Sequence, residues 1–91
     1  MKVVYDRGAL RDLNSIHVSI SQDDPGAAER AVGRVRSVVD HLSTSPYLGR
    51  PGRGGMRLLS IAGLPYVVIY RVRNELVHIV AIFHTARNRR F

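Results

Sequence analysis

The sequence predicts an α+β fold in which two helices cover one face of a mostly antiparallel sheet. In the first half of the chain, apolar residues recur three or four positions apart through two successive segments, as in amphipathic helices. The second half holds three short runs rich in Val, Ile, Leu and Tyr, separated by turn residues, as in strands. With 91 residues the chain has the length of one domain, so we expect residues 1–91 to form a single two-layer sandwich.

The first half is expected to be a strand followed by an antiparallel helical hairpin. Residues 2–5 form a short apolar run. From Ala9 a helix is expected to run to about Ser21, with one apolar stripe made of Leu10, Leu13, Ile16 and Ile20. Asp24 and Pro25 then supply an N-cap acid and a proline at the first helical position. The second helix repeats apolar residues at Ala28, Ala31, Val35, Val38, Val39 and Leu42.

The second half is expected to be a basic loop followed by a three-stranded antiparallel meander. Proline and glycine punctuate residues 44–55, which indicates a loop. The three strands are expected at residues 56–61, 66–73 and 76–84, the last two joined by a tight turn at Asn74 and Glu75. The last strand is apolar on both faces, so we expect it inside the sheet.

Positive charge is concentrated in the second half. Fourteen Lys and Arg residues oppose seven Asp and Glu, and the net charge is +7. Residues 1–43 are neutral overall, whereas residues 44–91 hold eight arginines against Glu75 alone. A field of one sign recruits an anionic partner, either nucleic acid or an acidic protein. Arginine suits bidentate contacts with carboxylate or phosphate.

Strand alternation indicates where this charge lies. Arg71 and Arg73 point away from the face of Tyr66 and Tyr70, which we expect to be packed aromatics. On the last strand we expect two rows: Val77, Ile79, Ala81 and Phe83 on one side, and His78, Val80, Ile82 and His84 on the other. Depending on register, the rows of these strands and of the strand bearing Arg57 would form one basic concave surface. Its candidate binding residues are Arg50, Arg53, Arg57, Arg71, Arg73, His84, Arg87, Arg89 and Arg90.

The composition excludes several kinds of site. Without cysteine the chain has neither disulfides nor thiolate chemistry. Its four histidines lack metal-ligand spacing, so we expect no metal and no cofactor. No apolar run approaches the roughly 20 residues of a membrane-spanning helix. A charge comes too early at the N-terminus for a signal peptide, so we expect a cytoplasmic protein that does not bind membranes.

Four segments resemble the ParE toxin pattern in order and spacing. They are Pro46-Tyr47-Leu48-Gly49-Arg50-Pro51, Met56-Arg57-Leu58-Leu59, residues 65–72 and residues 79–87. The first half is similar in layout, with Ala9 to Leu13 in the place of the family's first helix and Pro25-Gly26-Ala27-Ala28 at the start of the second. The resemblance covers nearly the whole chain and depends on the four motifs together, because each alone is weak.

This resemblance, to the RelE/ParE superfamily, implies the toxin of a type II toxin–antitoxin system. Such a toxin is neutralised by an antitoxin encoded beside it, whose disordered C-terminal segment wraps the toxin and folds on binding. The uneven charge is consistent with this partner, because an acidic amphipathic segment complements a basic surface with exposed apolar rows. We therefore expect a heteromeric complex with an acidic antitoxin.

The two branches of the superfamily differ in their target. RelE-like members cleave mRNA on the ribosome through attack of a 2′-OH on the adjacent phosphate, which requires a proton acceptor, a proton donor and cations. ParE-like members instead poison DNA gyrase. This chain has Val67 where RelE-like enzymes often have an arginine, and it ends in Phe91 instead of a tyrosine. The remaining candidates for a catalytic set are His84, Arg87, Arg57 and Arg71.

These departures favour a non-enzymatic gyrase inhibitor. A ribosome-dependent mRNA endoribonuclease is the alternative. A plain nucleic-acid-binding module is a rival of another class, but the basic side is predicted to be sheet and loop without a recognition helix. It also lacks the aromatic spacing of RNA-binding sheets. A toxin that has lost its activity and is kept as a binding protein stays open.

Overall fold

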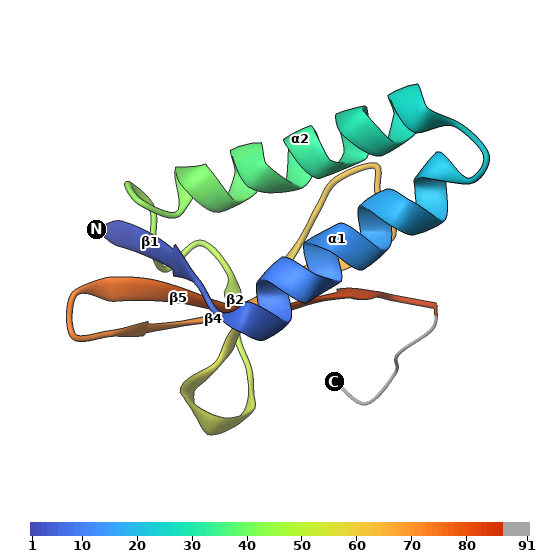
Figure 1. The fold of residues 1–91 in the computed structure, drawn as a ribbon. Helices are drawn as coiled ribbons and strands as arrows, with labels where there is room; N and C mark the ends of the chain where they lie inside the picture. Colours follow the sequence, from blue (N-terminus) through green and yellow to red (C-terminus); the bar gives the residue numbers. More distant parts are fainter. Residues whose placement is uncertain (87–91) are drawn as a thin grey trace.

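Two antiparallel helices lie on one face of a five-stranded sheet in the computed structural model, which describes residues 1–86 (Figure 1). The elements are β1 (Lys2–Tyr5), α1 (Arg7–Ser21), α2 (Pro25–His41), β2 (Arg50–Pro51), the 3-10 turn η1 (Arg53–Gly55), β3 (Arg57–Ser60), β4 (Tyr66–Arg73) and β5 (Leu76–His84). The strands lie side by side in the order β1-β5-β4-β3-β2. The predicted α+β class is confirmed, and β5 lies inside the sheet as expected.

The helices form where their caps and apolar spacing predict them. Asp24 caps α2 by accepting a hydrogen bond from the Ala27 N–H at 3.1 Å, directly before Pro25. The buried residues of the two helices are Ala9, Leu13, Ile16, Ala28, Ala31, Val35 and Val39. Leu10 is 47% exposed, so its place in the predicted stripe was wrong. The small side chain of Ala9 takes the buried position, because the helix packs closely against the sheet.

The β4–β5 hairpin closes through the predicted two-residue turn. Asn74 and Glu75 both have positive φ, 52° and 60°, which matches the right-handed twist of the paired strands. β3, β4 and β5 pair antiparallel, whereas β1 pairs parallel with β5 from Lys2 opposite Leu76 to Tyr5 opposite Ile79. The strand nearest the N-terminus is therefore joined to the last strand of the meander.

A β-bulge at Val80 changes which side chains of β5 face the helices. Tyr70 pairs with Ile79, but Ile69 pairs with Ala81, so Val80 is an extra residue. Val77, Ile79 and Ile82 consequently all belong to the core beneath the helices. The predicted rows of β5 were wrong beyond Ile79, because the inserted residue reverses the alternation: Ala81 and Phe83 pack on the other face.

Candidate binding surfaces

The face of the sheet opposite the helices, here called the open face, carries cations from several strands. Arg71 pairs with His78, Arg73 with Leu76, and Leu76 in turn with Lys2. Arg50 pairs with Leu58, which packs on this face. Because residues paired across neighbouring strands point to the same side, the open face holds Lys2, Arg50, Arg71 and Arg73.

The apolar centre of the open face is already covered. Leu58, Val67 and Ile69 are 8%, 5% and 2% exposed, and Met56, Val80, Ala81 and Phe83 pack around them. The segment from β2 to η1 folds below the sheet here (Figure 1). The centre of the open face is therefore buried, while Met56, Val80, Ala81 and Phe83 around it stay partly accessible beside its charged side chains.

A hollow of about 310 Å³ lies between η1 and β4. It is lined by Gly54, Gly55, Arg71, Val72 and Arg73. The two glycines have φ of 63° and 75°, a region that other residues seldom adopt. Arg53 belongs to the same turn. The hollow thus combines side-chain-free backbone with two arginine-bearing positions.

Arg57 does not join the open face. It pairs with Tyr70, whose side chain lies in the core beneath the helices. Its guanidinium donates to the Gly49 carbonyl at 2.8 Å and to the Tyr47 carbonyl at 3.4 Å, and lies 5.0 Å from the centre of the Tyr47 ring. These contacts hold the segment before β2 against β3, so the hypothesis that Arg57 shares one surface with Arg71 was wrong.

Gly49 approaches the sheet more closely than any larger residue could. A Cβ at this position would lie 2.8 Å from the Tyr70 ring and 2.9 Å from the Leu58 carbonyl oxygen. The Gly49 N–H donates to the Tyr70 hydroxyl at 2.8 Å, and Tyr70 is fully buried, as expected for a packed aromatic. The predicted loop contains a short edge strand, β2. Its proline argued against a strand in the sequence, because proline cannot donate a hydrogen bond within a sheet and is tolerated only at positions such as an edge.

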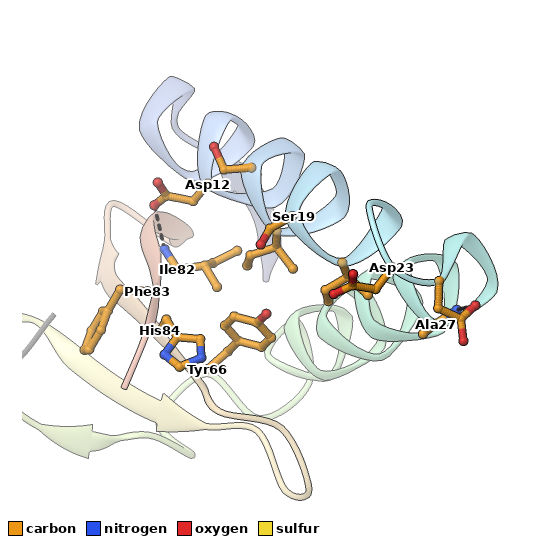
Figure 2. A pocket seen from close by; sticks show the side chains of 12 residues that line it. Asp12, Ser19, Asp23, Ala27, Tyr66, Ile82, Phe83 and His84 are labelled. Carbon is orange, nitrogen blue, oxygen red and sulfur yellow. Dashed lines mark hydrogen bonds between the residues drawn. The ribbon is translucent and has the colours of Figure 1, made fainter. Parts of the chain in front are cut away.

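His84 lies on the helix side, at the end of a groove with an acidic rim (Figure 2). The groove has a volume of about 590 Å³ and is lined chiefly by α1 and the end of β5. Three carboxylates, those of Asp12, Asp23 and Asp24, line it. Asp12 accepts a hydrogen bond from the Ile82 N–H at 2.9 Å. Ile82 lies past Ile79, the last residue of β5 that pairs with β1.

The His84 ring is occupied by local contacts. Its Nδ1 accepts a hydrogen bond from the Ala86 N–H at 3.1 Å, and its ring meets the Tyr66 ring edge to face at 5.5 Å. Since His84 belongs to the acidic groove, it too was wrongly assigned to the basic surface. The bulge at Val80 is the cause.

A second cationic surface runs along α2, where the sequence pattern predicted none. Two adjoining hollows of about 300 and 340 Å³ share Arg34 and lie between α2 and the β3–β4 hairpin. This α2 groove carries Arg30, Arg34 and His41 beside apolar residues, namely Ala27, Ala31, Val38, Leu48, Leu59, Ala62 and Leu64. Leu48 is 54% exposed.

The α2 groove was not predicted, because the net charge of the first half of the chain is zero. Residues 1–43 are neutral in sum, but their charges line different surfaces: Asp12, Asp23 and Asp24 line the acidic groove, while Arg30 and Arg34 line the α2 groove. Of the opposite charges among these five residues, only Asp24 and Arg30 are in contact, at 3.9 Å. The four-residue spacing of Arg30 and Arg34, which places them on one helix flank, was the available signal. Arg87, Arg89 and Arg90 lie outside the described residues.

Arg36 contributes to neither cationic surface, because Tyr5 holds it. Its guanidinium lies 5.6 Å from the centre of the Tyr5 ring. The Tyr5 hydroxyl is buried without a hydrogen-bond partner among residues 1–86. Burial raises the pKa of Tyr5; Arg36 opposes this shift and Asp40 adds to it. This pair stabilises the contact between β1 and α2.

Two other kinds of site are absent from the described part of the chain. Residues 1–86 contain no group of three or more His, Asp or Glu side chains placed to hold a metal ion. In the same range, neither helix has the length and apolar character needed to cross a membrane.

Comparison with known proteins identifies the family. The sequence model of the ParE toxin of the type II toxin–antitoxin system parDE matches residues 3–89. The chain belongs to the ParE toxin family. It is therefore the toxin of a type II toxin–antitoxin system, as its resemblance implied, with a cognate antitoxin as partner.

Individual relatives of this ParE-family chain agree. A protein named putative toxin Y4kP from Sinorhizobium fredii is 43% identical over 77 residues, which cover 84% of this chain and 79% of the relative. Toxin RelE2 of Caulobacter vibrioides is 41% identical over 86 residues, covering 94% and 97%. A chain in the structure of the chromosomal ParDE TA system from P. aeruginosa aligns with a TM-score of 0.83 and 26% identity, covering 92% of this chain and 95% of that one.

Proposed function

We propose that this toxin poisons DNA gyrase, trapping the enzyme on cleaved DNA, instead of cleaving RNA itself. The observation that carries the proposal is the separation of the groups that an RNA-cleaving site would need. His84 lies on the helix side of the sheet, and its Nδ1 is occupied by the Ala86 N–H. Arg71 lies on the open face. The Arg57 guanidinium lies on the helix side and is bound to backbone carbonyls there.

Cleavage by a 2′-OH requires a base, an acid and cations around one phosphate. A phosphate near Arg71 would be separated from His84 by the thickness of the sheet. Val67, at the position where RelE-like enzymes often carry an arginine, is buried. The arrangement within residues 1–86 thus supports a toxin that acts by binding its target.

Two parallel assays test this function. Purified toxin is added to gyrase and supercoiled DNA, and trapped cleavage complexes are counted after detergent and protease treatment. The same preparation is added to translating ribosomes, and mRNA is mapped for new 5′ ends. We expect accumulation of cleaved DNA and intact mRNA. Cut mRNA with unaffected gyrase would instead establish the RelE-like alternative.

We further propose that the α2 groove holds the antitoxin, through an acidic amphipathic segment. The groove provides apolar contacts along its length and cations at Arg30 and Arg34, with the His41 ring beside them. No carboxylate among residues 1–86 lies within 4 Å of Arg34, and Arg30 has only a 3.9 Å contact with Asp24. An acidic segment would therefore gain pairing with charges that have little internal compensation.

Co-expression tests this partnership. The toxin alone is expected to arrest growth, and the product of a neighbouring acidic reading frame is expected to restore it. Restoration should fail when the acidic residues of the antitoxin's C-terminal segment are replaced by lysine. Normal growth with abundant, folded toxin alone would contradict the toxic activity, whereas rescue that ignores those acids would contradict the docking site.

A further inference from the structure

We infer that the open face binds the phosphodiester backbone of nucleic acid, with one phosphate seated in the hollow formed by Gly54, Gly55, Arg71 and Arg73. This goes beyond gyrase poisoning, since a gyrase poison needs contact only with the enzyme. It assigns the toxin a direct contact with DNA or RNA through chemistry that both polymers share.

The cations of the open face are spread in the way an extended polyanion requires. Residues two apart on a strand are about 7 Å apart, and neighbouring strands about 4.8 Å, so Arg71 and Arg73 start about 7 Å from each other. Lys2 lies two strands from Arg73, roughly 10 Å away. A duplex carries one charge for about every 1.7 Å of its axis, so such a spread would reach several phosphates at once.

These cations have few acids beside them. Within residues 1–86, no carboxylate lies within 4 Å of Lys2, Arg50, Arg71 or Arg73. Glu75 lies in the β4–β5 turn, and Asp6 lies 3.9 Å from His78. The positive field of the open face is therefore left for a ligand.

The hollow between η1 and β4 suits a phosphate group. Its volume of about 310 Å³ leaves room for a phosphate group. A Cβ built on Gly54 or Gly55 meets nothing within 4 Å, so this wall is bare backbone open to a ligand. Arginines pair with phosphate oxygens bidentately, and the strand β4 holds both arginines at fixed positions.

The same face is poorly suited to an amphipathic protein segment. Such a partner binds by burying exposed apolar side chains, but Leu58, Val67 and Ile69 are at most 8% exposed, and Met56, Val80, Ala81 and Phe83 around them are already partly buried. The α2 groove, by contrast, still exposes Leu48. The open face thus favours a ligand recognised by charge, and the α2 groove one recognised by charge and apolar contact together.

The test measures binding to a fluorescent DNA duplex of about 20 base pairs and a single-stranded RNA of about 20 nucleotides, by anisotropy between roughly 50 and 200 mM salt. The full-length toxin, made by cell-free synthesis, is compared with Arg71→Gln/Arg73→Gln. The matched control is Arg7→Gln/Arg11→Gln, which removes the same charge from exposed positions on α1. Circular dichroism confirms that each variant is folded.

We expect the open-face variant to bind both polymers about tenfold more weakly at about 100 mM salt. For DNA, the slope of log K against log salt concentration should become shallower by about 0.9 for each phosphate that the variant no longer neutralises. The control should bind like the unchanged protein. Equal weakening in the two variants would mean that only net charge matters, and would overturn the inference, as would undetectable binding of both polymers. The polymer that the unchanged toxin binds more tightly identifies the source of the phosphates.

A second measurement locates the phosphate. Titration with inorganic phosphate, followed by NMR of the backbone amides, should shift the Gly54 and Gly55 signals in the unchanged protein and leave them unmoved in Arg71→Gln/Arg73→Gln. Shifts confined to other amides would show that phosphate does not bind in this hollow. If the open-face variant still binds nucleic acid but no longer binds an acidic antitoxin peptide, the face belongs to protein instead. Gyrase assays are not involved, so the outcome is separate from that of the proposed function.

Discussion

The open face and the α2 groove both present arginines, but they differ in the apolar surface beside those arginines. On the open face Leu58, Val67 and Ile69 are nearly fully buried, with Met56, Val80, Ala81 and Phe83 packed against them. In the α2 groove, Val38, Leu48 and Leu59 stay within reach of a partner. Cationic surfaces on one small toxin can therefore be selective for different partners, because selectivity comes from the neighbours of the charges and not from the charges themselves.

The largest effect that would distinguish the surfaces is on antitoxin binding. Arg34→Glu places a negative charge in the middle of the α2 groove, where both hollows meet. We expect the affinity for the acidic antitoxin segment to fall about 100-fold, because an acid would face an acid in a partly desolvated site. Isothermal titration measures this, and Arg73→Glu on the open face is the control. Equal decreases in affinity would abolish the distinction between the surfaces.

Salt should separate the two surfaces as well. If about three phosphates bind at the open face, raising salt from about 50 to 200 mM is expected to weaken duplex DNA binding about 40-fold. The antitoxin segment should lose much less affinity, since its apolar contacts are not screened. Titrations at several salt concentrations give both slopes. Parallel slopes would show that the apolar lining of the α2 groove contributes little.

The segment before β2 connects the two surfaces, and one hydrogen bond positions it. Gly49, between Leu48 of the α2 groove and Arg50 of the open face, donates to the buried Tyr70 hydroxyl. Tyr70→Phe is expected to cost roughly 1 to 3 kcal/mol of unfolding free energy, because the Gly49 N–H loses its partner.

Urea unfolding measures this cost, with Tyr66→Phe as the control, since the Tyr66 hydroxyl makes no hydrogen bond to residues 1–86. Both antitoxin and DNA binding should weaken in Tyr70→Phe. Weakening confined to one partner would show that the segment positions only one surface.

The smallest effect concerns stability. Neutralising Arg71 and Arg73, or Arg30 and Arg34, should change the free energy of unfolding by less than about 0.5 kcal/mol, because none of these charges is buried in a network. Thermal melts of the two double variants provide the measurement. A drop of several kcal/mol in either would mean that those arginines hold the fold together and are not free for a partner.

Much of the fold and part of the site were predictable because local interactions decide them. The Asp24 cap, the helical spacing of α2, and the limits of β4 and β5 depend on residues close in the sequence, and the structure confirms them. Arg71 and Arg73 were correctly placed on one row, because alternation along β4 is regular. Arg57 and His84 were misplaced, because their faces depend on pairing with other strands.

The sequence by itself determined both helices and every strand except β2, the excess of positive charge and the kinship with ParE toxins. Only the tertiary structure decided which charges act together: it paired β1 with β5, inserted Val80 as a bulge, and placed Asp12, Asp23 and Asp24 along one groove and Arg30 and Arg34 along another. The physical reason is the two-residue period of a strand. One extra residue sends every later side chain to the opposite face, and whether that residue is accommodated depends on contacts between segments far apart in the chain.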